Sequence, residues 1–127
     1  MKFYYNGKLV RTSQTHTYTH AVLDLETGEC IGCRSSEQAA QQLAGERIRW
    51  RENEIENLQS AIKALKAGQT CYPFREGKHK GWTRFGPKVL ADREAAIARR
   101  EKRIEECRKE QAWFKENWKV VELEARA

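Results

Sequence analysis

The sequence predicts an α+β fold: a small N-terminal antiparallel β-meander of three or four strands, followed by two long antiparallel helices. Short runs rich in Thr, Tyr and Val, separated by turn residues, fill the N-terminal part. Two helix-forming stretches of similar length follow, each with apolar residues at heptad spacing. We therefore divide a single domain, 1–127, into a β part (1–34), a long helix (35–67), a basic aromatic loop (68–86), a second long helix (87–121) and a tail (122–127) that we expect to fray.

The β part begins with a strong hairpin signal. Asn6 and Gly7 separate two strand-like runs and supply the two positive φ angles that a type I′ turn requires. A third strand is predicted over 15–25 and, after a turn at Gly28, a fourth over 29–33. So few strands are not stable alone, so we expect their apolar face to lie on a helix.

The first helix is the longest uninterrupted helical stretch. Ser35 or Ser36 is a suitable N-cap and Gly68 a suitable C-terminal residue. Such a helix is about 45 Å long, whereas a chain of this size has a radius of gyration of only about 14 Å. We therefore expect another copy of the chain to cover it, so that the protein oligomerises through its helices. One interruption, Arg51, breaks an apolar seam formed by Ala44, Ile48, Ile55, Leu58, Ile62 and Leu65.

The loop at 68–86 carries most of the excess charge. The chain has a formal net charge of +6. Residues 68–88 contribute five basic side chains against one acidic one, or +4. Aromatic residues argue against disorder here, while Pro73, Gly77 and Gly81 argue against helix or strand. We expect Trp82 and Phe85 to sandwich a purine; the alternative is that the aromatics anchor the loop on the helices. Basic residues to hold phosphates are Arg75, Arg84 and Lys88.

The second helix is predicted to begin at Pro87, because proline suits a first helical position. Leu90, Ile97 and Ile104 continue an apolar seam in it. Polar residues interrupt this seam at three places, and we favour register-setting contacts over ligand contacts for them. These residues are Arg93, Arg100 and Gln111.

A second anion site is predicted in the β part. A dense run of short polar side chains follows the first hairpin, and Arg34-Ser35-Ser36 precedes the long helix. A helix N-terminus attracts phosphate, and Arg34 can make paired hydrogen bonds to it. The alternative is that the run is a strand edge and the serines only cap the helix. The predicted site residues are Gln14, His16, Thr17, Arg34, Ser35 and Ser36.

Other chemistry is poorly supported. The sequence has no glycine-rich phosphate loop, nucleophile elbow or zinc-protease helix, so we expect no enzyme and no cofactor. Cys30 and Cys33 have metal-ligand spacing, but no second pair follows, so we expect semi-buried thiols and no metal. There is no apolar run of membrane-spanning length and no signal-peptide pattern, which favours a soluble intracellular protein.

The opening of the chain, together with the predicted fold, resembles the phage Thoeris anti-defence proteins of the first, signal-sponge class. The resemblance rests on residues 3–13, FYYNGKLVRTS, and on the small sheet followed by two long helices. It implies a phage protein, in the host bacterial cytoplasm, that sequesters nucleotide immune messengers without cleaving them and assembles as dimers and hexamers. It also implies a cyclic ADP-ribose isomer as ligand, with cyclic trinucleotides at separate sites.

Within this resemblance, an aromatic residue and arginines hold the messenger between helices of paired protomers. The matching residue types here are Trp82 or Phe85 in the loop and Arg108 on the second helix, for which Lys109 is a substitute. The cyclic trinucleotide would take the site that includes Arg34. This reading expects no nucleic acid and no membrane as partner.

Two other functions stay open. A basic phage protein of this size can bind nucleic acid through its loop, which predicts a steep dependence of affinity on salt. Alternatively, the paired helices can block a host protein, as an anti-CRISPR does, which predicts a stoichiometric complex and no small ligand.

Overall fold

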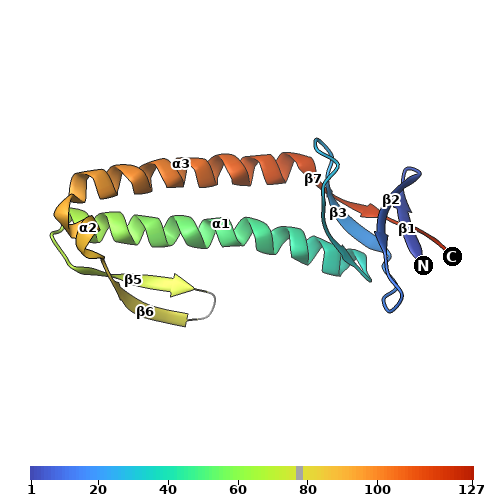
Figure 1. Cartoon of the computed structure of the whole chain (residues 1–127), viewed down its shortest axis with the longest axis horizontal. Coiled ribbons are helices and arrows are strands. Elements are labelled where there is room, and N and C mark those ends of the chain that lie inside the picture. The colour runs from blue at the N-terminus through green and yellow to red at the C-terminus, as the bar shows by residue number, and fades with distance from the viewer. Residues whose placement is uncertain (77–78) are drawn as a thin grey trace. The chain divides into compact units, whose positions relative to one another are not determined.

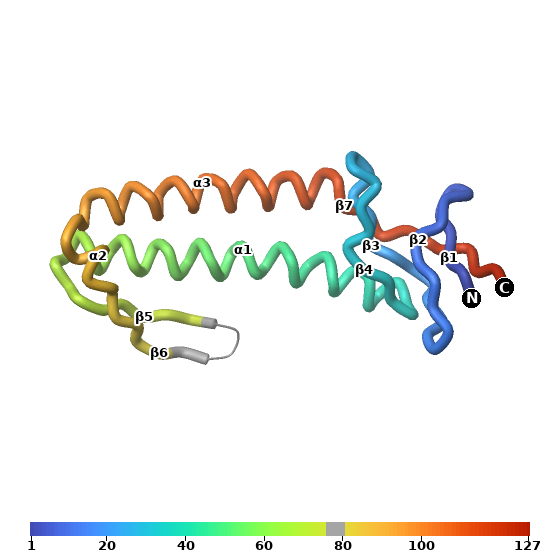
Figure 2. Tube along the Cα trace, in the orientation of Figure 1, coloured from blue at the N-terminus to red at the C-terminus, as the bar shows by residue number. Residues whose placement is uncertain are grey.

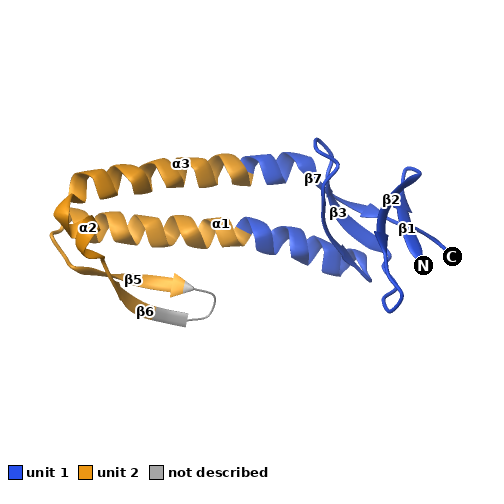
Figure 3. Cartoon of the chain, in the orientation of Figure 1, with its two compact units in different colours: residues 1–48, 112–127 blue, residues 49–111 orange. Residues whose placement is uncertain are grey.

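The computed structural model describes residues 1–76 and 79–127, and it confirms the α+β fold with the β part ahead of two long helices (Figure 1). The chain forms two compact units, 1–48 with 112–127 (unit 1) and 49–111 (unit 2) (Figure 3). Both long helices pass from one unit into the other. The elements are β1 (Lys2–Tyr5), β2 (Lys8–Thr12), β3 (His20–Asp24), β4 (Cys30–Arg34), α1 (Glu37–Lys66), β5 (Cys71–Glu76), β6 (His79–Arg84), α2 (Pro87–Ala91), α3 (Arg93–Asn117), β7 (Trp118–Glu122) and β8 (Glu124–Arg126).

Unit 1 contains two antiparallel three-stranded sheets, with strand orders β2-β1-β8 and β4-β3-β7. The predicted β1–β2 hairpin is confirmed: Tyr5 pairs with Lys8, and Asn6 and Gly7 have φ angles of 51° and 77°. The third strand is shorter than predicted, because it begins only at His20.

β3 is buried on both faces, which fixes the core of unit 1. Ala21 and Leu23 pack with Cys33 and Val121 on one face. On the other face Val22 packs against Ala40 and Leu43 of α1, so the expectation that the sheet lies on a helix is confirmed. A strand buried this way needs apolar residues at successive positions, as β3 has.

The sequence suggested a frayed C-terminal tail, and this prediction is wrong, because the residues form strands β7 and β8. β7 pairs along the whole of β3, and β8 pairs with β1 through three residues. Each N-terminal hairpin thus gains a third strand from the other end of the chain, which supplies the stability that a two-stranded hairpin lacks.

α1 begins and ends as predicted. The Ser36 Oγ accepts a hydrogen bond from the Ala39 amide at 3.1 Å, which makes Ser36 the N-cap. At the other end Gly68 has a φ of 76°, and the Gln69 amide donates to the Ala64 carbonyl at 3.0 Å. This is the glycine-terminated pattern of a Schellman cap.

Within unit 2, α1 and α3 pack antiparallel along the predicted apolar seams. Ile55, Ile62, Ile104 and Cys107 form one buried cluster. The seam interruptions link the helices: an ion pair joins Arg51 to Glu110, and Gln111 Nε2 donates to Glu52 at 3.0 Å. Arg93 Nη1 donates to the Gln69 carbonyl at 2.9 Å. These contacts support the register-setting reading of Arg51, Arg93 and Gln111. Arg100 instead donates to the Ala96 carbonyl of its own helix at 3.1 Å, so its side chain does not set the register.

The predicted helix over 87–121 is divided and shorter. Asp92 leaves the helical conformation, with φ −142° and ψ 82°, and its Oδ1 accepts from the Ala95 amide at 3.1 Å. Asp92 therefore caps a new helix, α3, because a short carboxylate satisfies amides at a helix start. After Asn117 the β-branched Val120 and Val121 continue as strand β7.

The predicted irregular loop is largely a β-hairpin. β5 and β6 pair with each other from Cys71–Arg84 to Glu76–His79. Pro73 and Gly81 do not prevent this, because in a two-stranded ribbon each strand has a free edge that tolerates a residue without an amide donor or a side chain. Gly77, part of the argument against strand, lies outside the described residues. Figure 2 shows the hairpin running beside the part of α1 that belongs to unit 2.

Candidate functional site

Unit 2 has an open cavity of about 630 Å³ that is lined by α1, α3 and β5. One face of α1 supplies most of its wall, since the contributing positions repeat at helical spacing. The lining residues are Trp50, Asn53, Glu54, Asn57, Leu58 and Ala61 from α1, Tyr72, Phe74 and Arg75 from β5, and Arg100 from α3.

Asn57 fixes the hairpin against the helix. Its Nδ2 donates to the Arg75 carbonyl at 2.6 Å, and its Oδ1 accepts from the Arg75 amide at 2.8 Å. The side-chain amide thus matches the donor and acceptor of one strand residue, as a neighbouring strand would. The cavity wall on the side of β5 is therefore held in place by α1.

Two aromatic rings close the wall formed by the hairpin. The Tyr72 and Phe74 rings meet edge to face with centroids 6.2 Å apart, and Tyr72 stacks on Phe85 at 4.8 Å. Phe85 is only 7% exposed and packs with Ala61 and Leu65 in the core of unit 2. The core thus holds Tyr72 in position, while Phe74 remains half-buried at the cavity.

Charge at the cavity comes from Arg100 and Glu54. The Arg100 guanidinium lies 5.7 Å from the Phe85 ring centroid and donates to the Ala96 carbonyl at 3.1 Å. Glu54 accepts two hydrogen bonds from Arg103, at 3.0 and 3.1 Å, and these lower the pKa of its carboxyl. Arg103 therefore balances the negative charge of Glu54. Arg100 of α3 contributes a positive charge to the cavity wall.

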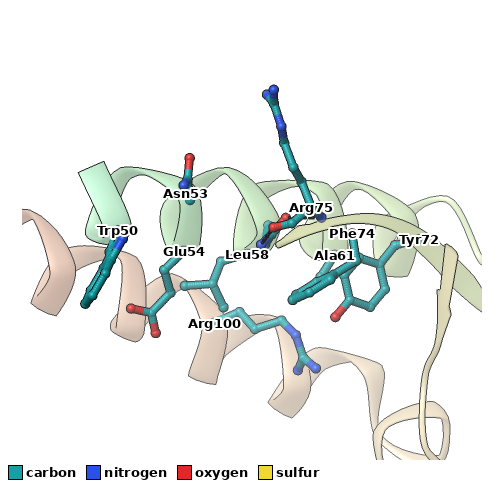
Figure 4. A pocket seen from close by; sticks show the side chains of 10 residues that line it. Trp50, Asn53, Glu54, Leu58, Ala61, Tyr72, Phe74, Arg75 and Arg100 are labelled. Atoms are coloured by element: carbon teal, nitrogen blue, oxygen red, sulfur yellow. Dashed lines mark hydrogen bonds between the residues drawn. The ribbon is translucent and has the colours of Figure 1, made fainter. Parts of the chain in front are cut away.

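Figure 4 shows the orientation of these side chains. Glu54, Leu58 and Arg100 extend into the space between the helices, and the rings of Tyr72 and Phe74 face the same space. Trp50 lies at one end, while the guanidinium of Arg75 points away from the group. Trp50 is half exposed, so an aromatic face is accessible at the rim.

A smaller hollow of about 340 Å³ lies on the other side of β5. Trp82 lines it with Phe74 and Arg75, and Trp82 is 71% exposed. The two hollows share three residues, so they form adjoining surfaces of one region of unit 2: Asn57, Phe74 and Arg75.

The residues predicted for the messenger site are only partly brought together. Trp82 and Arg75 lie at the smaller hollow, and Arg84 is an exposed residue of β6. Phe85 is a correction: it is a core residue, so its ring is already packed on Tyr72 and cannot sandwich a base. Arg108 is exposed on α3 and lines neither hollow.

The predicted second site lies in unit 1, and one hydrogen bond joins its two halves. Ser35 Oγ donates to the Thr17 carbonyl at 2.8 Å. The exposed Arg34 donates from Nη1 to the Cys33 carbonyl at 2.7 Å. The cap reading of Ser36 is confirmed, which does not decide whether the site also binds an anion.

His16 and Gln14 belong to the loop before β3. The His16 ring stacks on Tyr18 with centroids 5.7 Å apart, and its amide donates to Ser13 Oγ at 3.0 Å. Gln14 is exposed. These contacts order the loop that leads to Thr17.

Sequence reasoning missed most of the larger cavity. Trp50, Asn53 and Asn57 share one helix face at i, i+3 and i+7. A tryptophan on the same face as two asparagines, in a helix that is otherwise highly charged, could have indicated a binding surface on α1. The contributions of Tyr72 and Phe74 were not accessible, because they depend on the hairpin that the sequence did not predict.

Among the side chains of residues 1–75 and 81–127, no group of three or more His, Cys, Asp or Glu is placed to hold a metal ion. No helix among the described residues has the length and apolar character needed to cross a membrane.

Comparison with protein-family models, with curated proteins and with solved structures finds no match to this chain.

Proposed function

We propose that the protein sequesters cyclic nucleotide immune messengers, and that unit 2 binds them at its larger cavity. The observation that carries this is the composition of the cavity wall, where the aromatic side chains of Trp50 and Phe74 lie with Arg100. Aromatic rings stack on bases, and arginine binds phosphate. This is the set of groups that a nucleotide with a base and a diphosphate requires.

The proposed ligand class is a cyclic ADP-ribose isomer, with cyclic trinucleotides as a second class at the Arg34 region of unit 1. Sequestration, rather than turnover, is the proposed action, and the setting is a phage protein in the bacterial host cytoplasm. Self-assembly into dimers, and into hexamers built from those dimers, belongs to the same proposal. Support comes from the resemblance in residues 3–13 and from the cavity chemistry.

A matched pair of tryptophan substitutions tests where the messenger binds. Loss of a ring that stacks on a base weakens binding by about 1–3 kcal/mol, roughly thirtyfold in Kd at the middle of that range. We expect Trp50→Ala to show this loss by titration calorimetry with a cyclic ADP-ribose isomer. Trp82→Ala, which removes an exposed ring from the adjoining hollow, should stay within about twofold of wild type.

The pair also separates the alternatives. Loss in Trp82→Ala alone would move the ligand to the smaller hollow, as the sequence had suggested. Two variants that bind as the wild type does, at wild-type stability, would remove both hollows from the site and contradict the proposal.

A nucleic-acid-binding function is the second candidate, because Trp82 is 71% exposed on a hairpin that also carries the exposed Arg75 and Arg84. Exposed aromatics among cations suit single strands. Affinity that falls steeply and linearly on a double-logarithmic salt plot would favour this candidate. A ligand held in a cavity by few charges gives a much shallower slope.

A further inference from the structure

A β-bulge in β4 brings two cysteines to the same face of a sheet. Three positions apart on a regular strand, Cys30 and Cys33 would point to opposite faces. The pairing with β3 is irregular here: Cys30 lies opposite Leu23, Gly32 opposite Val22 and Cys33 opposite Ala21. Ile31 is therefore the extra residue, and the two cysteines face partners that are two positions apart.

The bulge leaves the thiols in contact. The Cys30 and Cys33 Sγ atoms are 3.8 Å apart. Their strand partners are separated by two rises of about 3.3 Å, which suggests about 6.6 Å between the cysteine Cα atoms. Disulfides span Cα separations of about 4.4–6.8 Å, so closure to a sulfur–sulfur bond of about 2.05 Å needs side-chain rotation and little backbone movement.

The two thiols differ in accessibility. Cys33 is 1% exposed and packs with Ala21, Leu23 and Val121. Cys30 is half-buried and lines an open cavity of about 590 Å³ in unit 1, whose other walls include Leu9, Val10 and Leu25. A small reagent can therefore reach Cys30 through the cavity, whereas Cys33 is reached only through Cys30.

The pKa of Cys33 also indicates that Cys30 reacts first and Cys33 second. Burial raises the pKa of the Cys33 thiol to about 11, and the adjacent Cys30 adds to the rise. The Arg11 guanidinium lowers the pKa of Cys33, but burial outweighs this effect. Cys33 is thus a poor initial nucleophile and is suited to the second, intramolecular step.

We propose that Cys30 and Cys33 form a reversible dithiol–disulfide site that exchanges with low-molecular-weight disulfides entering through the unit 1 cavity. The Cys30 thiolate attacks the reagent RS–SR, forms a mixed disulfide and releases one RS⁻. The Cys33 thiolate then attacks the Cys30 sulfur, forms the internal disulfide and releases the second RS⁻. The protein loses two protons and two electrons, and the reagent is reduced to two RSH.

A metal ion is the competing occupant of a Cys-x-x-Cys pair. A tetrahedral thiolate site needs four ligands. Within 1–75 and 81–127 no third His, Cys, Asp or Glu side chain completes such a site with the two cysteines. Disulfide exchange needs only the pair itself, so the geometry favours exchange.

The test treats the folded protein with oxidised glutathione and follows the intact mass. Wild type should lose two hydrogen atoms without retaining glutathione. Cys33→Ser should retain one glutathione at Cys30, because the resolving thiol is absent, and Cys30→Ser should form no internal disulfide. The matched control is Cys71→Ser, which removes a half-buried cysteine in unit 2 and should behave as wild type does.

Peptide mapping decides the outcome. An internal bond that persists in Cys30→Ser, a bond that includes Cys71, or a wild type that retains glutathione without closing would each overturn the proposal. A second measurement compares the equilibrium constant for exchange with glutathione in the native and the guanidinium-unfolded chain. We expect the native value to be at least about tenfold higher, because the bulge holds the sulfurs together. Equal values would show that the fold does not position the pair.

Discussion

At the residue scale, Asp24 shows how one buried carboxylate joins distant parts of unit 1. It is 5% exposed, and its Oδ2 accepts a hydrogen bond from Trp113 Nε1 at 3.0 Å. Its Oδ1 accepts from the amides of Glu26 and Thr27, at 2.9 and 3.2 Å. The carboxylate thus organises the turn after β3 and fixes it to the end of α3.

This arrangement predicts a specific acid sensitivity. The hydrogen bond from Trp113 leads the contributions that lower the pKa of Asp24, despite the opposing effect of burial. Because the native pKa lies below the unfolded value of about 3.9, the stabilisation is complete above that pH and is lost as the pH falls through the native pKa. Urea denaturation at pH 7 and at pH 3 should show a smaller loss of stability for Asp24→Asn than for wild type. Equal losses in the two proteins would show that Asp24 is not an acid-sensitive contact.

The residue scale is also where sequence reasoning was least accurate. Trp82 and Phe85 look equivalent in sequence, yet Phe85 is buried and Trp82 is 71% exposed. The two differ because Trp82 lies within β6 opposite Pro73, while Phe85 follows the strand and turns into the helical core. Which ring faces solvent depends on the register of a hairpin, and the sequence did not reveal that hairpin.

At the element scale, local signals predicted what local chemistry controls. Asn6-Gly7, the Ser36 cap and the glycine after α1 each act over a few residues, and all three were confirmed. β7 and β8 were missed because their pairing partners, β3 and β1, lie about a hundred residues earlier. An amphipathic helix and a strand compete in such a segment, and only the distant partner decides between them.

Two glycines of this scaffold should respond oppositely to the same substitution. Gly45 lies inside α1, and a Cβ there would meet nothing within 4 Å. Gly45→Ala should stabilise the protein by about 0.5–1 kcal/mol, because alanine loses less backbone entropy in a helix. Gly68 has a φ of 76°, so Gly68→Ala should destabilise it by about 1 kcal/mol. Urea midpoints that shift in the same direction for both variants would contradict this account of α1.

At the scale of the whole molecule, the apolar residues that the structure describes form four buried clusters, two within each unit. The larger cavity of unit 2 is assembled from residues on α1, β5 and α3. The sequence could indicate the basic and aromatic composition of that region. It could not indicate the cavity, whose wall depends on the contacts that Asn57 and Phe85 make with β5.

Self-assembly is the prediction that belongs to this scale. Helices as long as α1 and α3 present more surface than one chain of this size is expected to cover, so we predict that copies of the chain pair through them. Light scattering coupled to size-exclusion chromatography should give a mass of at least two chains. A monomer that persists at micromolar concentration would contradict assembly, but it would leave binding within one chain to be tested directly.

The most direct test of sequestration is to incubate the protein with a cyclic ADP-ribose isomer, measure its melting temperature, and then denature it and identify the released nucleotide. Ligand that binds only the native state raises the melting temperature by mass action. We predict a raised melting temperature and recovery of the messenger intact, in an amount that matches the binding sites. An unchanged melting temperature with this messenger and with cyclic trinucleotides, or recovery of a cleaved product, would contradict the account.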